Sequence, residues 1–217
     1  MNARTLSTRG YSEMPWIWDD RRELFVNTET GKTAPLEDMP ELVDALITDA
    51  WDDLDEALAE KPEPRKVRNI VLLLLSDLYL ILAALGIGGL IALDANLRAQ
   101  IEEMLARQVG YLDLAISQYL AERISPAELR RRARMYLNSA RSAYWTTRDE
   151  FEKRRGKVEQ RWIAVGDRNT CSPCLDAERL GWVPIGTLGV PGSGIVTITP
   201  TTMCEGLTNC RCQIAYR

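Results

Sequence analysis

Apolar residues recur at helical spacing over most of the chain between residues 39 and 155. In residues 39–59 an apolar side chain appears every three or four positions, and acidic residues occupy the opposite face. Residues 94–124 show the same spacing over a longer stretch. Both segments are therefore predicted to be amphipathic helices, each of which buries one face.

A third helix is predicted over residues 126–155, because both of its ends carry sequence signals. Ser125 is a suitable N-cap, Pro126 a suitable first helical residue, and Glu128 the acidic member of a capping box. Gly156 is placed to end the helix. One continuous helix of this length would extend roughly 45 Å.

Residues 70–93 form the most apolar stretch, which is long enough to cross a bilayer. Two features favour a helix buried in protein instead. An ionised Asp77 inside the run would be costly in hydrocarbon. The Gly86-Ile-Gly-Gly89 cluster indicates a bend that ends an apolar helix of about sixteen residues. We therefore expect a buried helix, with a membrane segment as the alternative.

The two ends of the chain have a different character. Residues 1–35 are predicted to form an extended arm, in which Trp16 and Trp18 lie on one side and cover either this protein's own core or another surface. Residues 1–25 contain no apolar segment typical of a signal peptide. From residue 159 onward Gly, Pro and Thr are frequent, and the β-prone runs are short.

Charge is distributed unevenly, although the net charge is only −4. Residues 1–64 carry 6 basic and 16 acidic side chains, whereas residues 123–161 carry 12 basic and 5 acidic ones. The simplest interpretation is that the acidic segment and the basic helix attract each other, within one subunit or between subunits. A basic face that meets nucleic acid is the alternative.

The five cysteines lie close together near the end of the chain, which has no histidine. A Cys-x2-Cys pair followed about thirty residues later by a second cysteine cluster is typical of a site for Zn²⁺, which four thiolates bind tetrahedrally. An odd number of cysteines fits metal binding better than a disulfide framework. The candidate ligands are Cys171, Cys174, Cys204, Cys210 and Cys212.

The pattern leaves open which four of the five cysteines bind the ion. A site with at least four candidate thiolates indicates a structural metal rather than a catalytic one, which keeps an open position. A thiol–disulfide role for Cys171 and Cys174 is a weaker alternative, because no thioredoxin-like context accompanies them. Without histidine or a phosphate-binding loop, the chain has no recognisable catalytic constellation and is not expected to be an enzyme.

These patterns predict a mainly α protein with a long-helix body and a small C-terminal β/loop module stapled by zinc. Residues 1–64 would form an acidic N-terminal arm and helix, and residues 65–158 a helical body. Residues 159–217 would form the cysteine-rich, zinc-binding module, which is too small to fold by apolar burial alone.

Several motifs of the last third resemble the C-terminal pattern of the phage Mu F-like head morphogenesis proteins, the minor head or minor capsid proteins of tailed phages. The family's pattern ends in His-Pro-x-Cys-Arg-Cys, whereas this chain has Leu207-Thr208 in place of His-Pro, so Cys204 takes the place of the usual histidine ligand. The motifs that carry the resemblance are Arg161-Trp-Ile-Ala-Val-Gly-Asp167, Cys171-Ser-Pro-Cys174, Gly181-Trp-Val-Pro184 and Asn209-Cys210-Arg-Cys212-Gln-Ile214.

This resemblance implies a structural or assembly protein of a tailed-phage virion. Such a protein would be oligomeric in the virion and would associate with the portal, the neck or the capsid interior, after assembly in the host cytoplasm. Contact with packaged DNA through the basic helix 126–155 would be compatible with it. The alternatives are a membrane-active ejection protein that uses residues 70–93 and a zinc-dependent DNA-binding protein that uses residues 123–161.

Overall fold

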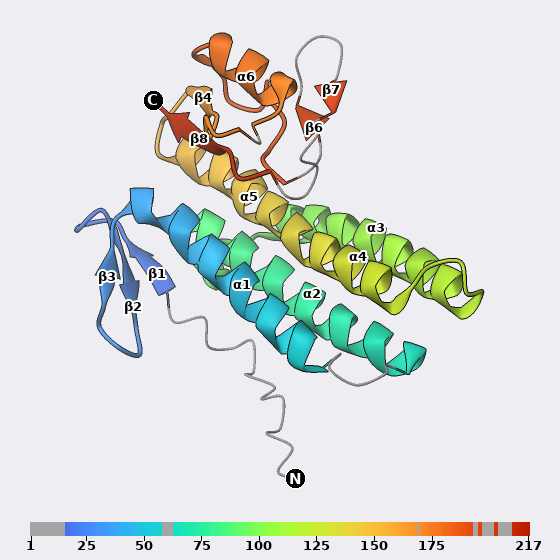
Figure 1. Ribbon diagram of the computed structural model, residues 1–217. Helices are drawn as coiled ribbons and strands as arrows, with labels where there is room; N and C mark the ends of the chain where they lie inside the picture. Colours follow the sequence, from blue (N-terminus) through green and yellow to red (C-terminus); the bar gives the residue numbers. More distant parts are fainter. Residues whose placement is uncertain (1–15, 58–62, 169, 193–194, 197–201, 204–209) are drawn as a thin grey trace.

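The structure is a computed structural model. Four of its helices pack around a central fifth helix, which spans residues 64–87 (Figure 1). The residues that the structure describes are 16–57, 63–168, 170–192, 195–196, 202–203 and 210–217. The α-helices are α1 (Met39–Ala57), α2 (Pro64–Ile87), α3 (Ala95–Leu120), α4 (Pro126–Ser139), α5 (Arg141–Arg154) and α6 (Ser172–Arg179). The strands are β1 (Trp16–Asp19), β2 (Leu24–Asn27), β3 (Thr33–Ala34), β4 (Glu159–Ile163), β5 (Val183–Pro184), β6 (Ile195–Val196), β7 (Thr202–Met203) and β8 (Gln213–Tyr216).

The mainly helical fold is as predicted, with small sheets at both ends of the chain. α2 lies at the centre of the helical body and packs against α1, α3, α4 and α5 (Figure 1). By length and composition α2 could cross a membrane, but most of its apolar segment is buried inside the protein. Leu75, Leu82 and Leu85 of this helix are completely buried. These contacts are those of a core helix.

α2 ends within its glycine cluster, between Ile87 and Gly88. Gly88 has a φ of 89°, in the left-handed region that glycine adopts without strain, and its N–H donates to the carbonyls of Ala84 and Leu85. The predicted break is therefore confirmed. The helix is longer than predicted, because it already begins at Pro64.

The prediction of one continuous helix over residues 126–155 is wrong. Its start is confirmed, since the Ser125 hydroxyl accepts from the N–H of Glu128 at 3.1 Å. Ala140, however, separates α4 from α5. The hydroxyl of Ser139 donates to the carbonyl of Tyr136 and that of Ser142 to the carbonyl of Ser139, both at 2.6 Å. Such side-chain bonds to the backbone compete with the regular helical ladder and bend helices.

The N-terminal segment is a small sheet rather than the predicted extended arm. β1, β2 and β3 pair in this order as antiparallel strands. Trp18 lies edge-to-face against both Phe25 and Phe151, with ring centroids 5.3 Å apart in each case. Trp18 therefore covers the protein's own core, one of the two predicted roles. Residues 1–15, the beginning of the predicted arm, lie outside the described residues.

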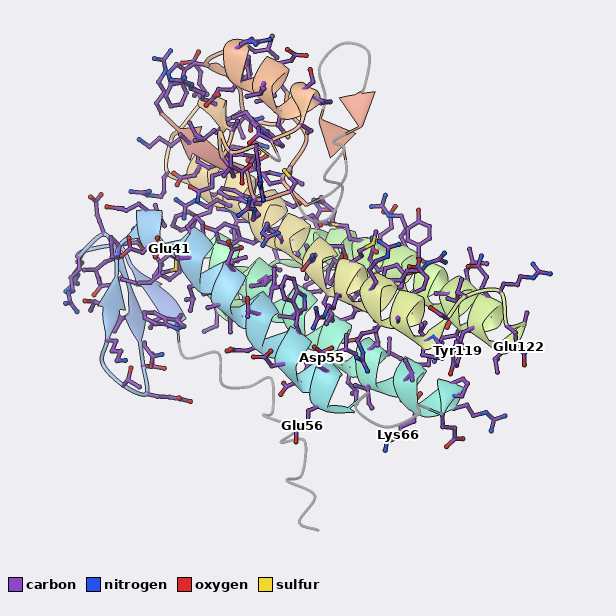
Figure 2. The ribbon with its side chains drawn as sticks, in the orientation of Figure 1. Glu41, Asp55, Glu56, Lys66, Tyr119 and Glu122 are labelled. Atoms are coloured by element: carbon purple, nitrogen blue, oxygen red, sulfur yellow. The ribbon has the colours of Figure 1, made fainter. Side chains whose placement is uncertain are left out.

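The predicted attraction between acidic and basic segments occurs within one chain. Asp55, which lies on α1 (Figure 2), forms ion pairs with Arg130 and Arg134 of α4. Asp44, also on α1, forms an ion pair with Arg141 at the start of α5. Much of the basic surface expected from the sequence is thus neutralised by carboxylates of the same chain.

The C-terminal module lies over α5 (Figure 1). Its main sheet has the order β5-β4-β8, and both pairings are antiparallel. Trp162 on β4 is completely buried. Because β4 pairs with β8, the beginning of the module is joined to the end of the chain, and the cysteine segments are held between them.

Candidate metal centre

The first two cysteines lie at the N-terminus of α6. Cys171 is the N-cap residue of this helix, and Cys174 lies in its first turn, where its N–H donates to the carbonyl of Cys171 at 3.1 Å. Pro173 is suited to this turn because a proline lacks the N–H that would stay unpaired there. The partial positive charge of a helix N-terminus stabilises thiolates. The local sequence therefore places two sulfurs at the N-terminal end of one helix.

The other two described cysteines precede β8, and the pairing of β8 with β4 brings them to α6. The sulfurs of Cys174, Cys210 and Cys212 lie within 4.8 Å of one another, and all three residues are buried. The Sγ–Sγ distance is 3.9 Å between Cys174 and Cys210 and 3.3 Å between Cys171 and Cys174. Zn–S bonds of 2.3 Å in a tetrahedron require sulfurs about 3.8 Å apart. The cluster is therefore of the right size for a metal ion.

The environment of Cys212 favours a thiolate. Hydrogen bonds from Cys174 and Cys210 are the largest cause that lowers the pKa of Cys212 to about 3, and burial opposes them. The backbone of Val165 and the side chain of Trp162 lower the pKa further. Thiolates are the form in which cysteine binds metals. The buried tryptophan of β4 thus contributes to the site as well as to the core.

Arginines reach the region of the cysteines both from nearby in the sequence and from the helical body. Of the arginines close in sequence, Arg211 forms an ion pair with Asp167, and Arg179 pairs with Asp176 on the surface. Arg141, seventy positions before the last cysteines, reaches the site instead: its Nη1 donates to the carbonyl oxygen of Cys210 at 3.2 Å. No local sequence signal indicates this contact, because it depends on how α5 packs beneath the module.

Arg141 joins the helical body to the cysteine module, so we expect its partner Asp44 to stabilise both. Replacing Asp44 with alanine leaves a guanidinium that is 9 % exposed without its carboxylate. The expected loss in free energy of unfolding is about 1–2 kcal/mol, measured by urea denaturation. Limited proteolysis should also cut the module, residues 159–217, faster. The control is Asp49→Ala on the exposed face of the same helix, whose free energy of unfolding should stay within about 0.5 kcal/mol of the wild-type value. Equal losses of stability in the two variants would contradict the prediction.

The structure brings three of the five predicted ligands, Cys174, Cys210 and Cys212, into one cluster, and Cys171 adjoins it through Cys174. Cys171, Cys174, Cys210 and Cys212 are all buried, and none of them is in a disulfide. Cys204 lies outside the described residues. Buried sulfur donors at these distances can hold a soft or borderline metal ion.

No protein-family model, curated protein or solved structure matches this chain.

Asp149 is a buried carboxyl group that lies where α5 meets β8. Asp149 is 8 % exposed, and its Oδ1 accepts a hydrogen bond from the Tyr216 hydroxyl at 2.6 Å. Burial raises the pKa of Asp149 to about 6, although Tyr216 and the charge of Lys153 act in the opposite direction. The sequence carries no signal for this carboxyl, which is one of several on a charged helix.

The raised pKa predicts a pH-dependent cost in stability. The folded protein holds the Asp149 proton more tightly than the unfolded chain, whose pKa is near 3.8. The stability that this proton contributes is complete below pH 3.8 and is lost as the pH rises through about 6. Asp149→Asn is therefore expected to raise the free energy of unfolding by up to about 3 kcal/mol at pH 8 and much less at pH 4. Urea denaturation at both pH values checks this, and an equal effect at the two values would contradict it.

Proposed function

We propose that the cysteine cluster is a structural zinc site with Cys171, Cys174, Cys210 and Cys212 as ligands. Thiolate sulfurs suit Zn²⁺, and burial of all four residues leaves little room for an open coordination position. The ion would fasten α6 to the segment before β8 and so hold the small module together. A closed site of this kind serves stability rather than catalysis.

We further propose that the protein is a non-enzymatic structural or assembly component of a tailed-phage virion. It would be a minor head protein at the portal, the neck or the capsid interior. The observation that carries this proposal is the geometry of the motifs that resemble the Mu F-like family. Their tryptophan, Trp162, lies beside Cys212, and the Cys171–Cys174 turn faces the closing cysteine pair. Motifs that are separated in the sequence thus lie together in space, which is expected if they belong to one structural module.

The two other candidate functions receive less support. A membrane-active ejection protein needs α2 to leave a core in which most of its apolar segment is buried. A DNA-binding protein needs free cations on α4 and α5, but Arg130, Arg134 and Arg141 are ion-paired with α1. These observations favour helix packing and assembly over either alternative.

Quantitative mass spectrometry of purified virions tests the proposed function. We expect this chain in the particle, at a copy number near that of the portal protein. Hundreds of copies would make it a shell or cement component, which would contradict the proposed position. Absence from the particle, together with normal heads in a deletion mutant, would contradict the virion role itself.

A further inference from the structure

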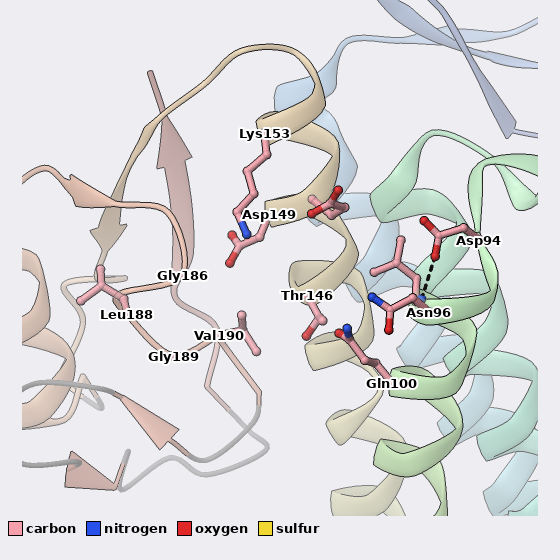
Figure 3. A pocket seen from close by; sticks show the side chains of 12 residues that line it. Asp94, Asn96, Gln100, Thr146, Asp149, Lys153, Gly186, Leu188, Gly189 and Val190 are labelled. Carbon is pink, nitrogen blue, oxygen red and sulfur yellow. Dashed lines mark hydrogen bonds between the residues drawn. The ribbon is translucent and has the colours of Figure 1, made fainter.

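An open cavity of about 440 Å³ lies between the helical body and the C-terminal module (Figure 3). The start of α3, the outer side of α5 and residues 186–190 of the module form its walls. This volume falls in the range of small-molecule sites. The cavity is separate from the cysteine cluster, and none of the residues proposed as zinc ligands lines it.

Two opposite charges of α5 face this cavity, and the charge of Lys153 acts on Asp149 without forming an ion pair with it. Asp149 uses one oxygen to accept from Tyr216, and no described residue donates to its other oxygen. Lys153, one turn further along α5, forms no ion pair with a described residue. Figure 3 shows both side chains extending from α5 into the space beside residues 186–190. The cavity thus offers one anchoring carboxylate and one anchoring ammonium group.

The other two carboxylates on its wall share one arginine, Arg154. Asp94 accepts from Arg154 at 2.8 Å, and Glu150 pairs with the same guanidinium at 3.3 Å. The carboxylates are also not gathered as metal ligands are, because the one candidate metal cluster among the described residues is that of the cysteines. Apart from these two paired carboxylates, the charged lining residues are one carboxylate and one ammonium group, Asp149 and Lys153, a combination that suits a zwitterion better than a simple cation or a simple anion.

Apolar and amide groups complete the wall. Leu97 and Leu188 are 5 % and 3 % exposed and give the cavity an apolar side. The side-chain amides of Asn96 and Gln100 each offer a donor and an acceptor (Figure 3). A ligand with a short aliphatic group and a zwitterionic head would find a partner for each part.

We propose that this cavity binds a free α-amino acid with an aliphatic side chain. Asp149 receives the ammonium group, Lys153 the carboxylate, and Leu97 and Leu188 the side chain. A buried carboxylate without a salt bridge lowers the stability of the folded protein at neutral pH, and such groups cluster at binding sites. The ligand's ammonium group would form the direct ion pair with Asp149 that Lys153 does not form.

Isothermal titration calorimetry of the full chain with L-leucine at pH 7.5 tests the proposal. We expect saturable binding with one site per chain. Asp149→Asn and Lys153→Met should each weaken it at least about tenfold, which corresponds to about 1.4 kcal/mol. The matched controls Asp38→Asn and Lys157→Met change an exposed and a half-buried residue outside the cavity and should bind like wild type. Circular dichroism confirms that each variant is folded.

Two analogues distinguish the zwitterion from its parts. L-Leucinamide lacks the carboxylate, and 4-methylpentanoate lacks the ammonium group, so each should bind at least about tenfold more weakly than leucine. If leucinamide binds as tightly as leucine, the cavity recognises a peptide N-terminus or another amine, and the proposal is wrong. No saturable leucine binding, or unchanged affinity in folded Asp149→Asn, would also overturn it.

Discussion

Replacing Gly86 with alanine is expected to destabilise the helical body by at least about 3 kcal/mol. Gly86 lies where α2 crosses α5, and a methyl group there would overlap the Thr147 hydroxyl and the Tyr144 carbonyl oxygen. It would also lie 3.1 Å from the backbone nitrogen of Arg148. Two of these three obstacles are backbone atoms, so the helices themselves must separate. The hydrogen bond from Thr147 to the carbonyl of Ala83, 2.8 Å long, would be lost with them.

Gly110 provides the matched control, because it also lies inside a helix. A methyl group at this position of α3 would meet no atom within 4 Å. Gly110→Ala is expected to be neutral or to stabilise by up to about 1 kcal/mol, since alanine favours the helix. Urea denaturation followed by circular dichroism gives both values. Similar midpoints for Gly86→Ala and wild type would show that α2 and α5 do not pack as closely as described.

Replacing Cys174 with serine is expected to release bound zinc and to unfold the C-terminal module while the helical body stays folded. Cys174 contacts both Cys171 and Cys210, so its loss removes the central sulfur of the cluster. The free energy of unfolding of the module is expected to fall by several kcal/mol, because metal binding and folding are coupled in small domains held together by a metal ion. Metal analysis should show about one zinc per wild-type chain and none in the variant. A chelator should have the same effect on the wild type.

The control for this variant is Ser172→Ala, which changes an exposed neighbour on the same turn and should keep the zinc. Limited proteolysis should cut residues 159–217 in Cys174→Ser and spare α1 to α5. Retention of zinc with unchanged affinity in Cys174→Ser would contradict the ligand assignment. Simultaneous unfolding of the helical body would show that the module is an integral part of the core.

Cys171 and Cys204 compete for the fourth position, and the same measurements decide between them. We expect Cys171→Ser to lose zinc and Cys204→Ser to keep it, since Cys171 lies 3.3 Å from the Cys174 sulfur. The opposite result would favour the ligand set that the resemblance implies, with Cys204 in the place of histidine.

Features that depend on near neighbours could be predicted from the sequence alone. The cap at Ser125 and the end of α2 at Gly88 follow from residues within one helical turn. The mainly helical fold follows from the spacing of apolar residues, and the strand at β8 from a β-prone run. The spacing of the cysteines likewise indicated the candidate metal centre, because ligands near each other in sequence turn back on one ion.

Features that depend on distant partners became visible only in the packed protein. The approach of Thr147 to Gly86 and the contact of Arg141 with the Cys210 carbonyl join residues more than sixty positions apart. The break at Ala140 interrupts a segment whose apolar pattern is continuous, and the burial of Asp149 depends on Tyr216 of β8. The pattern along a chain indicates which face of a segment is buried, but the position of each contact follows from how the segments pack against one another.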